Sequence, residues 1–246
     1  MQLYFGVGKI SEATKDRVVY RVLSLNDLIQ VIIPHFEKYP LLAQKKADFL
    51  LFKSALKLIN EGKHLLKEGL IEIVNIKASM NRGLSLVLKQ NFPGVMPVER
   101  LLISNQIIAD PSWLAGFTSA EGFFFVSVGK SKNKTGYAVS LWFTLTQDSR
   151  DVNLFEVIKN YLNCGNVLVS TKDPVVKFNV TKFTDNFNIV VPFFSKFNLW
   201  AKSKDFLDFC RVAELINDKS HLTNEGLEKI LKIKSEMNTG RKFNEV

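Results

Sequence analysis

The chain has 246 residues, of which 46% are hydrophobic, and this is enough to bury one sizeable core or two small ones. Its 33 Lys and Arg against 24 Asp and Glu give a formal net charge of +9, which favours binding to a polyanion such as nucleic acid. No apolar run approaches the ~18 residues of a membrane span. Residues 1–6 lack the basic and apolar regions of a secretory signal, so we expect a soluble protein with no membrane partner.

Elements near the N-terminus recur later in the chain. Residues 9–12 and 17–23 are predicted strands, and residues 64–83 form a predicted helix. The pattern of that helix returns at residues 221–240, an offset of 221 − 64 = 157. A period of this length indicates two copies of one small domain, because solenoid repeats are much shorter. Further pairs at or near this offset are residues 48–50 with 205–207, and Pro34 with Pro192.

The two copies differ in how much sequence precedes their shared part. The 48 residues 113–160 stand ahead of Tyr161, whereas three residues stand ahead of Tyr4, its equivalent. We therefore expect residues 1–83 to be a truncated first repeat that lacks its first helix and first two strands. Residues 84–111, which are rich in Pro and Gly, are the expected connector. Residues 112–246 are the expected complete second repeat.

The second repeat opens with a helix of small and apolar residues, predicted over residues 112–121 and ended by Gly122. Small residues four apart let two helix backbones approach closely. We therefore expect this helix to pack against a twin and to bring Glu121 beside the twin's acid. Two such carboxylates next to DNA would suit Mg²⁺ or another divalent cation. The small residues of the expected interface are Ala115, Gly116, Ser119 and Ala120.

The predicted strands that follow, over residues 123–128 and 139–146, have two faces. Leu141, Phe143 and Leu145 alternate with polar residues, so we expect them to face the core. The outward residues could then read base edges in a DNA groove. These are Ser127, Ser140, Trp142, Thr144 and Thr146, with Lys177 and Asn179 on a later strand and Arg21 in the place of Asn179 in the first repeat. The turn between the two strands carries Lys130, Lys132 and Lys134, which we expect to contact phosphates.

The remaining predicted elements complete the repeat. A helix has apolar residues Leu154, Phe155, Ile158 and Leu162 on one face, and two strands follow at residues 166–170 and 175–180. Helices are predicted over residues 185–197, 204–216 and 223–237, the last ended by Gly240. The fold class is therefore α+β, with an antiparallel four-stranded sheet in the complete repeat and helices on one face.

The segment Leu114-Ala-Gly-Phe-Thr-Ser-Ala-Glu-Gly122 resembles the motif of the LAGLIDADG homing endonucleases, and the resemblance extends over almost the whole chain. It implies a site-specific endonuclease that cuts double-stranded DNA with a divalent metal, encoded by an intron of a fungal organelle and working in the mitochondrion. It also implies that Glu121 is a metal ligand. By the same resemblance Gln147 lies near the cleavage centre, and Lys202 with its counterpart Lys45 orients water or stabilises the phosphate.

Two other functions remain open from the sequence. One is a maturase that binds intron RNA through the same basic surface, and the other is an inactive nucleic-acid-binding remnant. Because the chain supplies one motif acid, a second acid would come from a missing N-terminal segment or from self-association through the motif helix. Glu121 could also be an idle acid at a helix end, and Gly116 and Ala120 could serve ordinary packing.

Overall fold

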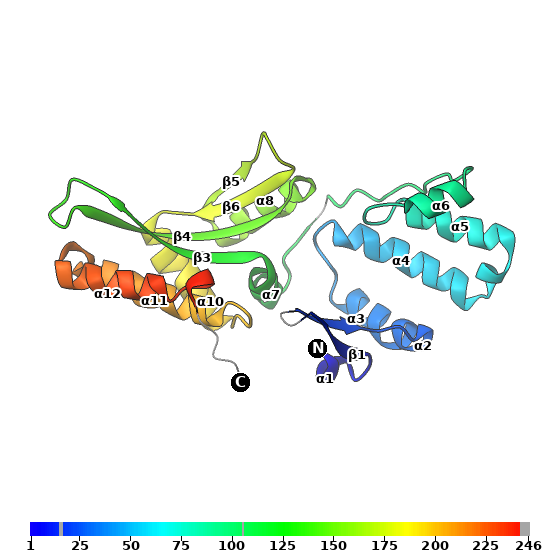
Figure 1. Ribbon diagram of the computed structural model, residues 1–246, viewed down its shortest axis with the longest axis horizontal. Helices are drawn as coiled ribbons and strands as arrows, with labels where there is room; N and C mark the ends of the chain where they lie inside the picture. The colour runs from blue at the N-terminus through cyan, green and yellow to red at the C-terminus, as the bar shows by residue number, and fades with distance from the viewer. Residues whose placement is uncertain (15–16, 105, 242–246) are drawn as a thin grey trace. The chain divides into compact units, whose positions relative to one another are not determined.

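The computed structural model describes residues 1–14, 17–104 and 106–241, and the chain forms two compact units (Figure 1). Unit 1 is Met1–Asn105 and unit 2 is Gln106–Val246, so the division falls within residues 84–111. Both units combine helices with antiparallel strands, which confirms the α+β prediction. None of the helices in the described ranges is long and apolar enough to cross a membrane.

Unit 2 contains a four-stranded antiparallel sheet with the strand order β3-β4-β6-β5. Its strands are β3 (Gly122–Lys130), β4 (Tyr137–Asp148), β5 (Asn166–Val169) and β6 (Val175–Val180). The helical elements are α7 (Pro111–Glu121), η3 (Ser149–Asp151), α8 (Val152–Leu162), α9 (Phe183–Asp185), η4 (Asn186–Val190), α10 (Val191–Lys196), α11 (Ser203–Asn217), η5 (Ser220–Leu222), α12 (Asn224–Ser235) and η6 (Asn238–Gly240).

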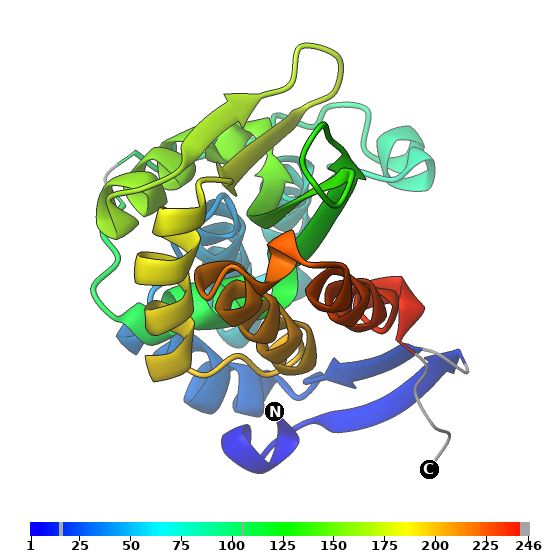
Figure 2. The ribbon, with the colours of Figure 1, turned by 90° about the vertical axis from the view of Figure 1, so that its left-hand side faces the viewer.

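The core of unit 2 is an aromatic cluster between the sheet and the helices. Phe143 on β4 stacks on Phe124 of β3 with ring centroids 5.1 Å apart, and it meets Phe194 of α10 edge-on at 5.3 Å. Phe124 also contacts Phe209 of α11 at 5.3 Å. These four side chains are at most 1% exposed. Figure 2 shows α10, α11 and α12 grouped on one side of the strands, so this side of the sheet is the buried one.

The passage from α7 into β3 depends on a close approach at Gly122. Its backbone is extended, with φ −83° and ψ 152°, so positive φ is not what requires glycine here. A Cβ atom at this position would lie 2.4 Å from the carbonyl oxygen of Thr118. The absence of a side chain therefore lets the strand leave directly from the end of the helix.

Several predicted boundaries differ from the structure; in unit 1 the helix predicted over residues 64–83 is divided into η2 and α5, and α5 ends at Ala78. The last helix, α12, ends at Ser235, two residues before the predicted end at residue 237, and the left-handed residue that follows it is Asn238, with φ 53°, and not Gly240. The side chain and backbone of Asn238 are both hydrogen-bonded there, which offsets the strain of that conformation. Strands β3 and β4 are each longer than predicted and run into the lysine-rich turn.

Unit 1 repeats the second part of unit 2. Its elements are α1 (Gln2–Phe5), β1 (Lys9–Thr14), β2 (Arg17–Arg21), α2 (Leu25–Asp27), η1 (Leu28–Ile32), α3 (Ile33–Lys38), α4 (Lys45–Asn60), η2 (Lys63–Leu65), α5 (Lys67–Ala78) and α6 (Leu86–Asn91). The π-helix η1 recurs as the π-helix η4 at an offset of 186 − 28 = 158. Within the described residues the sheet of unit 1 has two strands, β1 and β2.

Part of the predicted connector is bound to unit 1. The backbone N–H of Met96 donates to Asn75 Oδ1 at 3.0 Å. The guanidinium of Arg100 pairs with Asp48 and donates to the carbonyl oxygens of Gln44 at 2.9 Å and Ser79 at 3.1 Å. Burial by itself would raise the pKa of Asp48, but hydrogen bonds from Arg100 and from the backbone of Asn81 outweigh it and hold the pKa below its ordinary value.

We expect Phe143→Ala to lower the free energy of unfolding by about 3–5 kcal/mol, because it opens a cavity in the aromatic core. Thr144→Ala, its neighbour on the opposite face of β4, should change that free energy by less than about 0.5 kcal/mol. Chemical denaturation of the two variants beside the unchanged chain measures both values. The reverse ranking would show that the two faces of β4 are wrongly assigned.

We also expect the amides of β1 and β2 to exchange with deuterium faster than those of β5 and β6. A two-stranded sheet is marginal in water, and Val18 on β2 is 65% exposed while its counterpart Val176 on β6 is 0% exposed. Hydrogen–deuterium exchange with peptide resolution compares the two pairs in one sample. Equal protection of both pairs would contradict this expectation.

Candidate active site and nucleic-acid interface

The face of the unit 2 sheet that points away from the core presents polar side chains in rows. Ser127 lies opposite Ser140, Thr144 lies opposite Asn179, and Thr146 lies opposite Lys177. Trp142 is 40% exposed and its indole N–H donates to Ser140 Oγ at 3.0 Å. Leu141, Phe143 and Leu145 are buried on the other face, as the alternation predicted. The structure therefore brings together the predicted outward residues of β3, β4 and β6.

Two aromatic residues on the same face were not selected from the sequence. Phe123 is 41% exposed and stacks on Phe125, with ring centroids 5.8 Å apart and planes 17° from parallel. The ammonium of Lys234 lies 4.8 Å from the centre of the Phe125 ring. Three consecutive phenylalanines in a strand must place either one or two of them outward. The sequence of residues 123–125 therefore already indicated that at least one aromatic side chain faces outward.

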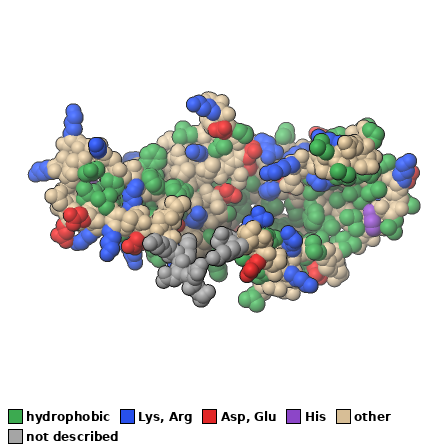
Figure 3. Space-filling model, viewed as in Figure 1, with side chains coloured by type: hydrophobic (Ala, Val, Ile, Leu, Met, Phe, Trp, Pro, Cys, Tyr) green, Lys and Arg blue, Asp and Glu red, His purple; other side chains and the backbone are tan. Residues whose placement is uncertain are grey.

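Three lysines lie at the end of β3 and in the turn that follows it: Lys130 is the last residue of β3, and the other two lie in the turn before β4. Lys130, Lys132 and Lys134 are all exposed. The Asn133 amide donates to the carbonyl oxygen of Tyr137, and Gly136 takes a left-handed φ of 75°, so the turn closes on its own backbone. Figure 3 shows basic side chains at this end of unit 2, on the left of the view. Their charge is available to an anionic ligand that lies along the sheet.

Helix α7 ends in a carboxylate that is free to bind a ligand. Glu121 is exposed, and among the described residues its carboxylate makes no ion pair or hydrogen bond. Asp110 caps the start of the helix by accepting from the Ser112 N–H at 2.8 Å. The helix therefore delivers Glu121 to the end of β3, at the edge of the polar face.

The four small residues of α7 fall into two environments. Gly116 and Ala120 are exposed, and a Cβ atom on Gly116 would meet nothing within 4 Å. Ala115 is buried. Ser119 is half-buried, and its hydroxyl donates to the carbonyl oxygen of Ala115 at 2.9 Å and accepts from the Trp200 N–H at 3.1 Å. Gly116 and Ala120 thus form the open stripe of the helix, while Ser119 is bonded within unit 2.

The other candidate site residues lie at the ends of elements. Gln147, near the end of β4, is half-buried and its side-chain oxygen accepts from the Asp148 N–H at 3.1 Å. Lys202 is half-buried and directly precedes α11. In unit 1, Lys45 is the first residue of α4 and its ammonium donates to Asn81 Oδ1 at 3.1 Å. Arg21, the counterpart of Asn179, is exposed at the end of β2.

The single free carboxylate at the end of α7 suits a divalent ion that takes few of its ligands from the protein. No group of three or more His, Cys, Asp or Glu side chains within the described ranges is placed to hold a metal ion. Mg²⁺ is commonly held by one or two carboxylates together with water and phosphate oxygens. The free carboxylate of Glu121 fits one such ligand.

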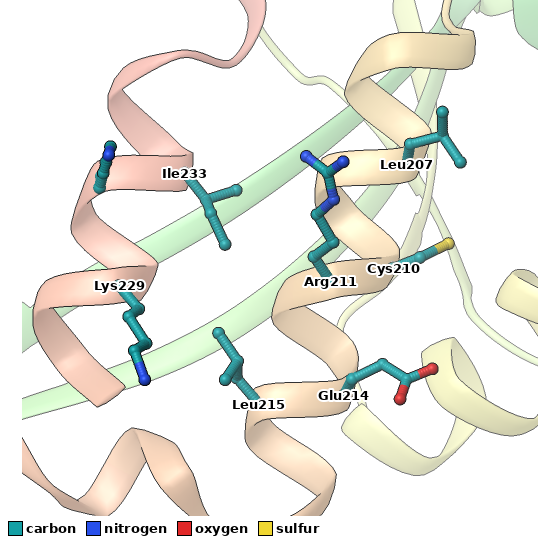
Figure 4. A pocket seen from close by; sticks show the side chains of 8 residues that line it. Leu207, Cys210, Arg211, Glu214, Leu215, Lys229 and Ile233 are labelled. Atoms are coloured by element: carbon teal, nitrogen blue, oxygen red, sulfur yellow. The ribbon is translucent and has the colours of Figure 1, made fainter. Parts of the chain in front are cut away.

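Both cysteines are free and partly buried. Burial, with smaller contributions from Asp185 and Glu214, raises the pKa of Cys164 and of Cys210 to about 11. Both thiols are therefore protonated at neutral pH. Cys210 lines a groove between α11 and α12 together with Leu207, Arg211 and Ile233 (Figure 4), on the helices and away from the polar face.

The sequence and the fold match a known family. The model of a family described as LAGLIDADG endonuclease matches residues 1–56 and 114–213, which is more than half of the chain. The chain belongs to the LAGLIDADG endonuclease family. The prediction made from the motif at residues 114–122 is therefore confirmed at the level of the family.

Relatives and solved structures agree with this membership. Two proteins of Neurospora crassa, named probable intron-encoded endonucleases 3 and 2, are 45% and 38% identical over 94% and 96% of this chain. The alignments cover 44% and 54% of those proteins, so the chain spans about half of their length.

The LAGLIDADG homing endonuclease I-SmaMI bound to cleaved DNA matches with a TM-score of 0.95 and 39% identity, over 98% of this chain and 81% of that one. The I-LtrWI enzyme bound to target DNA matches at 0.94 and 40%, over 98% and 82%.

We expect replacement of Lys130, Lys132 and Lys134 by Ala to weaken binding to duplex DNA about equally for all sequences, and to make the dependence of affinity on salt shallower. Contacts to phosphate carry no sequence information and release counterions. Fluorescence anisotropy with two unrelated duplexes over a salt series measures both effects. Replacing Lys57, Lys67 and Lys89 of unit 1 is the matched control for net charge, and an equal loss with these would contradict a special role for the turn.

Proposed function

We propose that this chain recognises and cuts double-stranded DNA as an intron-encoded homing endonuclease. The observation that carries the proposal is the polar outer face of the unit 2 sheet, which lies beside a helix ending in the free carboxylate of Glu121. The related enzymes I-SmaMI and I-LtrWI, whose folds match this chain, are named as bound to DNA. The net charge of +9 supports the same partner.

Sequence recognition is assigned to the outer face of the sheet. A DNA major groove is wide enough for strands, and Ser, Thr, Asn and Lys side chains can bind base edges there. The residues proposed for this contact are Ser127, Ser140, Trp142, Thr144, Thr146, Lys177 and Asn179, with Arg21 in unit 1. Lys130, Lys132 and Lys134 would bind phosphates and set the position of the duplex.

Strand cleavage is assigned to the end of α7. Glu121 would hold a divalent ion, proposed to be Mg²⁺, which supplies Lewis acidity to phosphodiester hydrolysis. Lys202 and Lys45 would bind the phosphate or orient water, and Gln147 would position a polar group near the same centre. One solved structure of I-SmaMI on its uncleaved target includes calcium ions, which supports a divalent ion in the family.

A second acid would come from a second motif helix packed on the open stripe of α7. Gly116 and Ala120 are exposed, and a Cβ atom on Gly116 would meet nothing within 4 Å, which favours close approach of another helix backbone. We propose that this helix belongs to a further polypeptide segment or to a second copy of the chain. The intron-encoded relatives support an organellar origin, for which we propose the mitochondrion.

One observation favours a second candidate function, in which the chain binds intron RNA as a maturase. Phe123 and Trp142 expose aromatic rings on the sheet face, and unpaired RNA bases stack on such rings. Competition between duplex DNA and single-stranded intron RNA distinguishes the two. Tighter binding of RNA, with no strand cleavage of DNA, would favour the maturase.

Once a second motif helix supplies the second acid, we expect Glu121→Gln to abolish Mg²⁺-dependent strand breaks while leaving the affinity for DNA unchanged. The amide keeps the shape of the side chain but is a poor ligand for a hard cation. The assay follows nicking of a supercoiled plasmid library that carries candidate target sites, with and without Mg²⁺. Glu156→Gln on α8 is the matched control, since that exposed acid pairs with Lys159 away from the site. Undiminished cutting by the Glu121 variant would defeat the proposed role.

A further inference from the structure

The chain around Lys202, from Trp200 in the loop to Asp205 in α11, is bound at two points to the segment that carries Glu121. The first contact joins residues that precede Lys202 and Glu121 in the sequence. The backbone N–H of Trp200, two positions before Lys202, donates to Ser119 Oγ at 3.1 Å, and Ser119 is two positions before Glu121. The Ser119 hydroxyl is itself oriented, because it donates to the carbonyl oxygen of Ala115 at 2.9 Å.

The second contact joins residues that follow Lys202 and Glu121 in the sequence, and Asn238 links the two. The Asn238 N–H donates to Asp205 Oδ1 at 2.9 Å, and Asp205 is three positions after Lys202. The Asn238 side-chain amide donates to the carbonyl oxygen of Phe124 at 3.0 Å, and Phe124 is three positions after Glu121. Glu121 and Lys202 are therefore each bracketed by residues that are joined to one another.

Asp205 is held in place by an arginine. Arg241 donates to Asp205 Oδ1 at 2.9 Å and to Asp208 Oδ2 at 2.6 Å. The side chains of Asp205 and Arg241 are only 13% and 17% exposed. A charge-assisted bond in such a partly buried place is stronger than one at an open surface. The acceptor of the Asn238 N–H is thus fixed before any ligand binds.

Unit 1 contains the same aspartate–asparagine contact with a different arginine. The Asn81 N–H donates to Asp48 Oδ1 at 2.9 Å, and Asp48 pairs with Arg100. The sequence counterpart of Arg241 is 241 − 157 = 84, which is a leucine, so the two arginines do not share a repeat position. The asparagine, in contrast, does share one, and in unit 1 its side chain accepts from Lys45. In both units the backbone N–H of this asparagine binds an aspartate in the first turn of a helix, but only in unit 2 does its side chain bind a strand, at the carbonyl oxygen of Phe124.

We propose that Ser119 and Asn238 are positioning residues that hold Lys202 at a fixed place relative to Glu121. The inference rests on the proposed function, in which Glu121 binds a divalent ion and Lys202 acts on the phosphate beside it. Neither Ser119 nor Asn238 touches the ion or the DNA in this scheme. Ser119 thereby has a role within unit 2 in addition to its place in the motif helix.

The test uses Mn²⁺ alone as a paramagnetic probe of the full, isotope-labelled chain. Mn²⁺ bound at Glu121 broadens the amide signals of nearby residues, and the effect falls steeply with distance. In the unchanged chain we expect broadening both at residues 119–124 and at residues 200–203. In Ser119→Ala and in Asn238→Gly we expect the broadening at residues 200–203 to be lost, while that at residues 119–124 remains. Glycine suits the left-handed backbone at position 238, so this change removes only the side chain.

Two further variants serve as matched controls. Ser119→Thr keeps the hydroxyl and should keep the original pattern. Ser235→Ala removes a hydroxyl that donates to the Lys232 carbonyl oxygen on α12, and it should also leave the pattern unchanged.

The possible outcomes separate the two proposals. Broadening at residues 200–203 that persists in both test variants would overturn the positioning role and leave the proposed function standing. A Glu121→Gln chain that broadens like the unchanged one, or an unchanged chain that shows no broadening near residue 121, would overturn the metal-ligand role of Glu121. The positioning role would then fail with it.

Discussion

The packing of Phe143 against the helices is the constraint on which the rest of unit 2 depends. Once the odd-numbered residues of β4 are buried, the even-numbered ones must face outward, because successive side chains in a strand alternate. The cross-strand register pairs these even-numbered β4 residues with odd-numbered residues of β3 and β6, and so places the odd-numbered residues of β3 and β6 on the same outer face. A hydrophobic requirement on one side of the sheet thus assembles the polar surface on the other side.

The end of α7 converts this sheet into a candidate active site. Gly122 lets β3 leave the helix without a loop, so Glu121 is held by a rigid element on each side. Sites that are built on helices and strands keep their geometry better than sites on loops. Lys202 does lie in a loop, and this is why the contacts of Ser119 and Asn238 are important for its position.

The two units keep the same aspartate at one repeat position but pair it with different arginines. Asp48 and Asp205 occupy the same repeat position and accept from equivalent backbone N–H groups. Their arginine partners come from unrelated positions, Arg100 in the segment after α6 and Arg241 after α12. A partly buried carboxylate requires a charged partner, and the fold supplies one from whichever segment passes close by.

The sequence alone determined the fold class, the repeat, the motif helix and the outward face, because each is encoded by local spacing of apolar, small or charged residues. Periodicity records which side of an element is buried, and this was sufficient to select Trp142, Thr144 and Lys177. Only the tertiary structure decided that Ser119 bonds to Trp200, that Arg100 belongs to Asp48, and that Asn238 rather than Gly240 makes the left-handed turn. These contacts join residues far apart in the chain, and a hydrogen bond between them depends on distances that exist only after the core has packed.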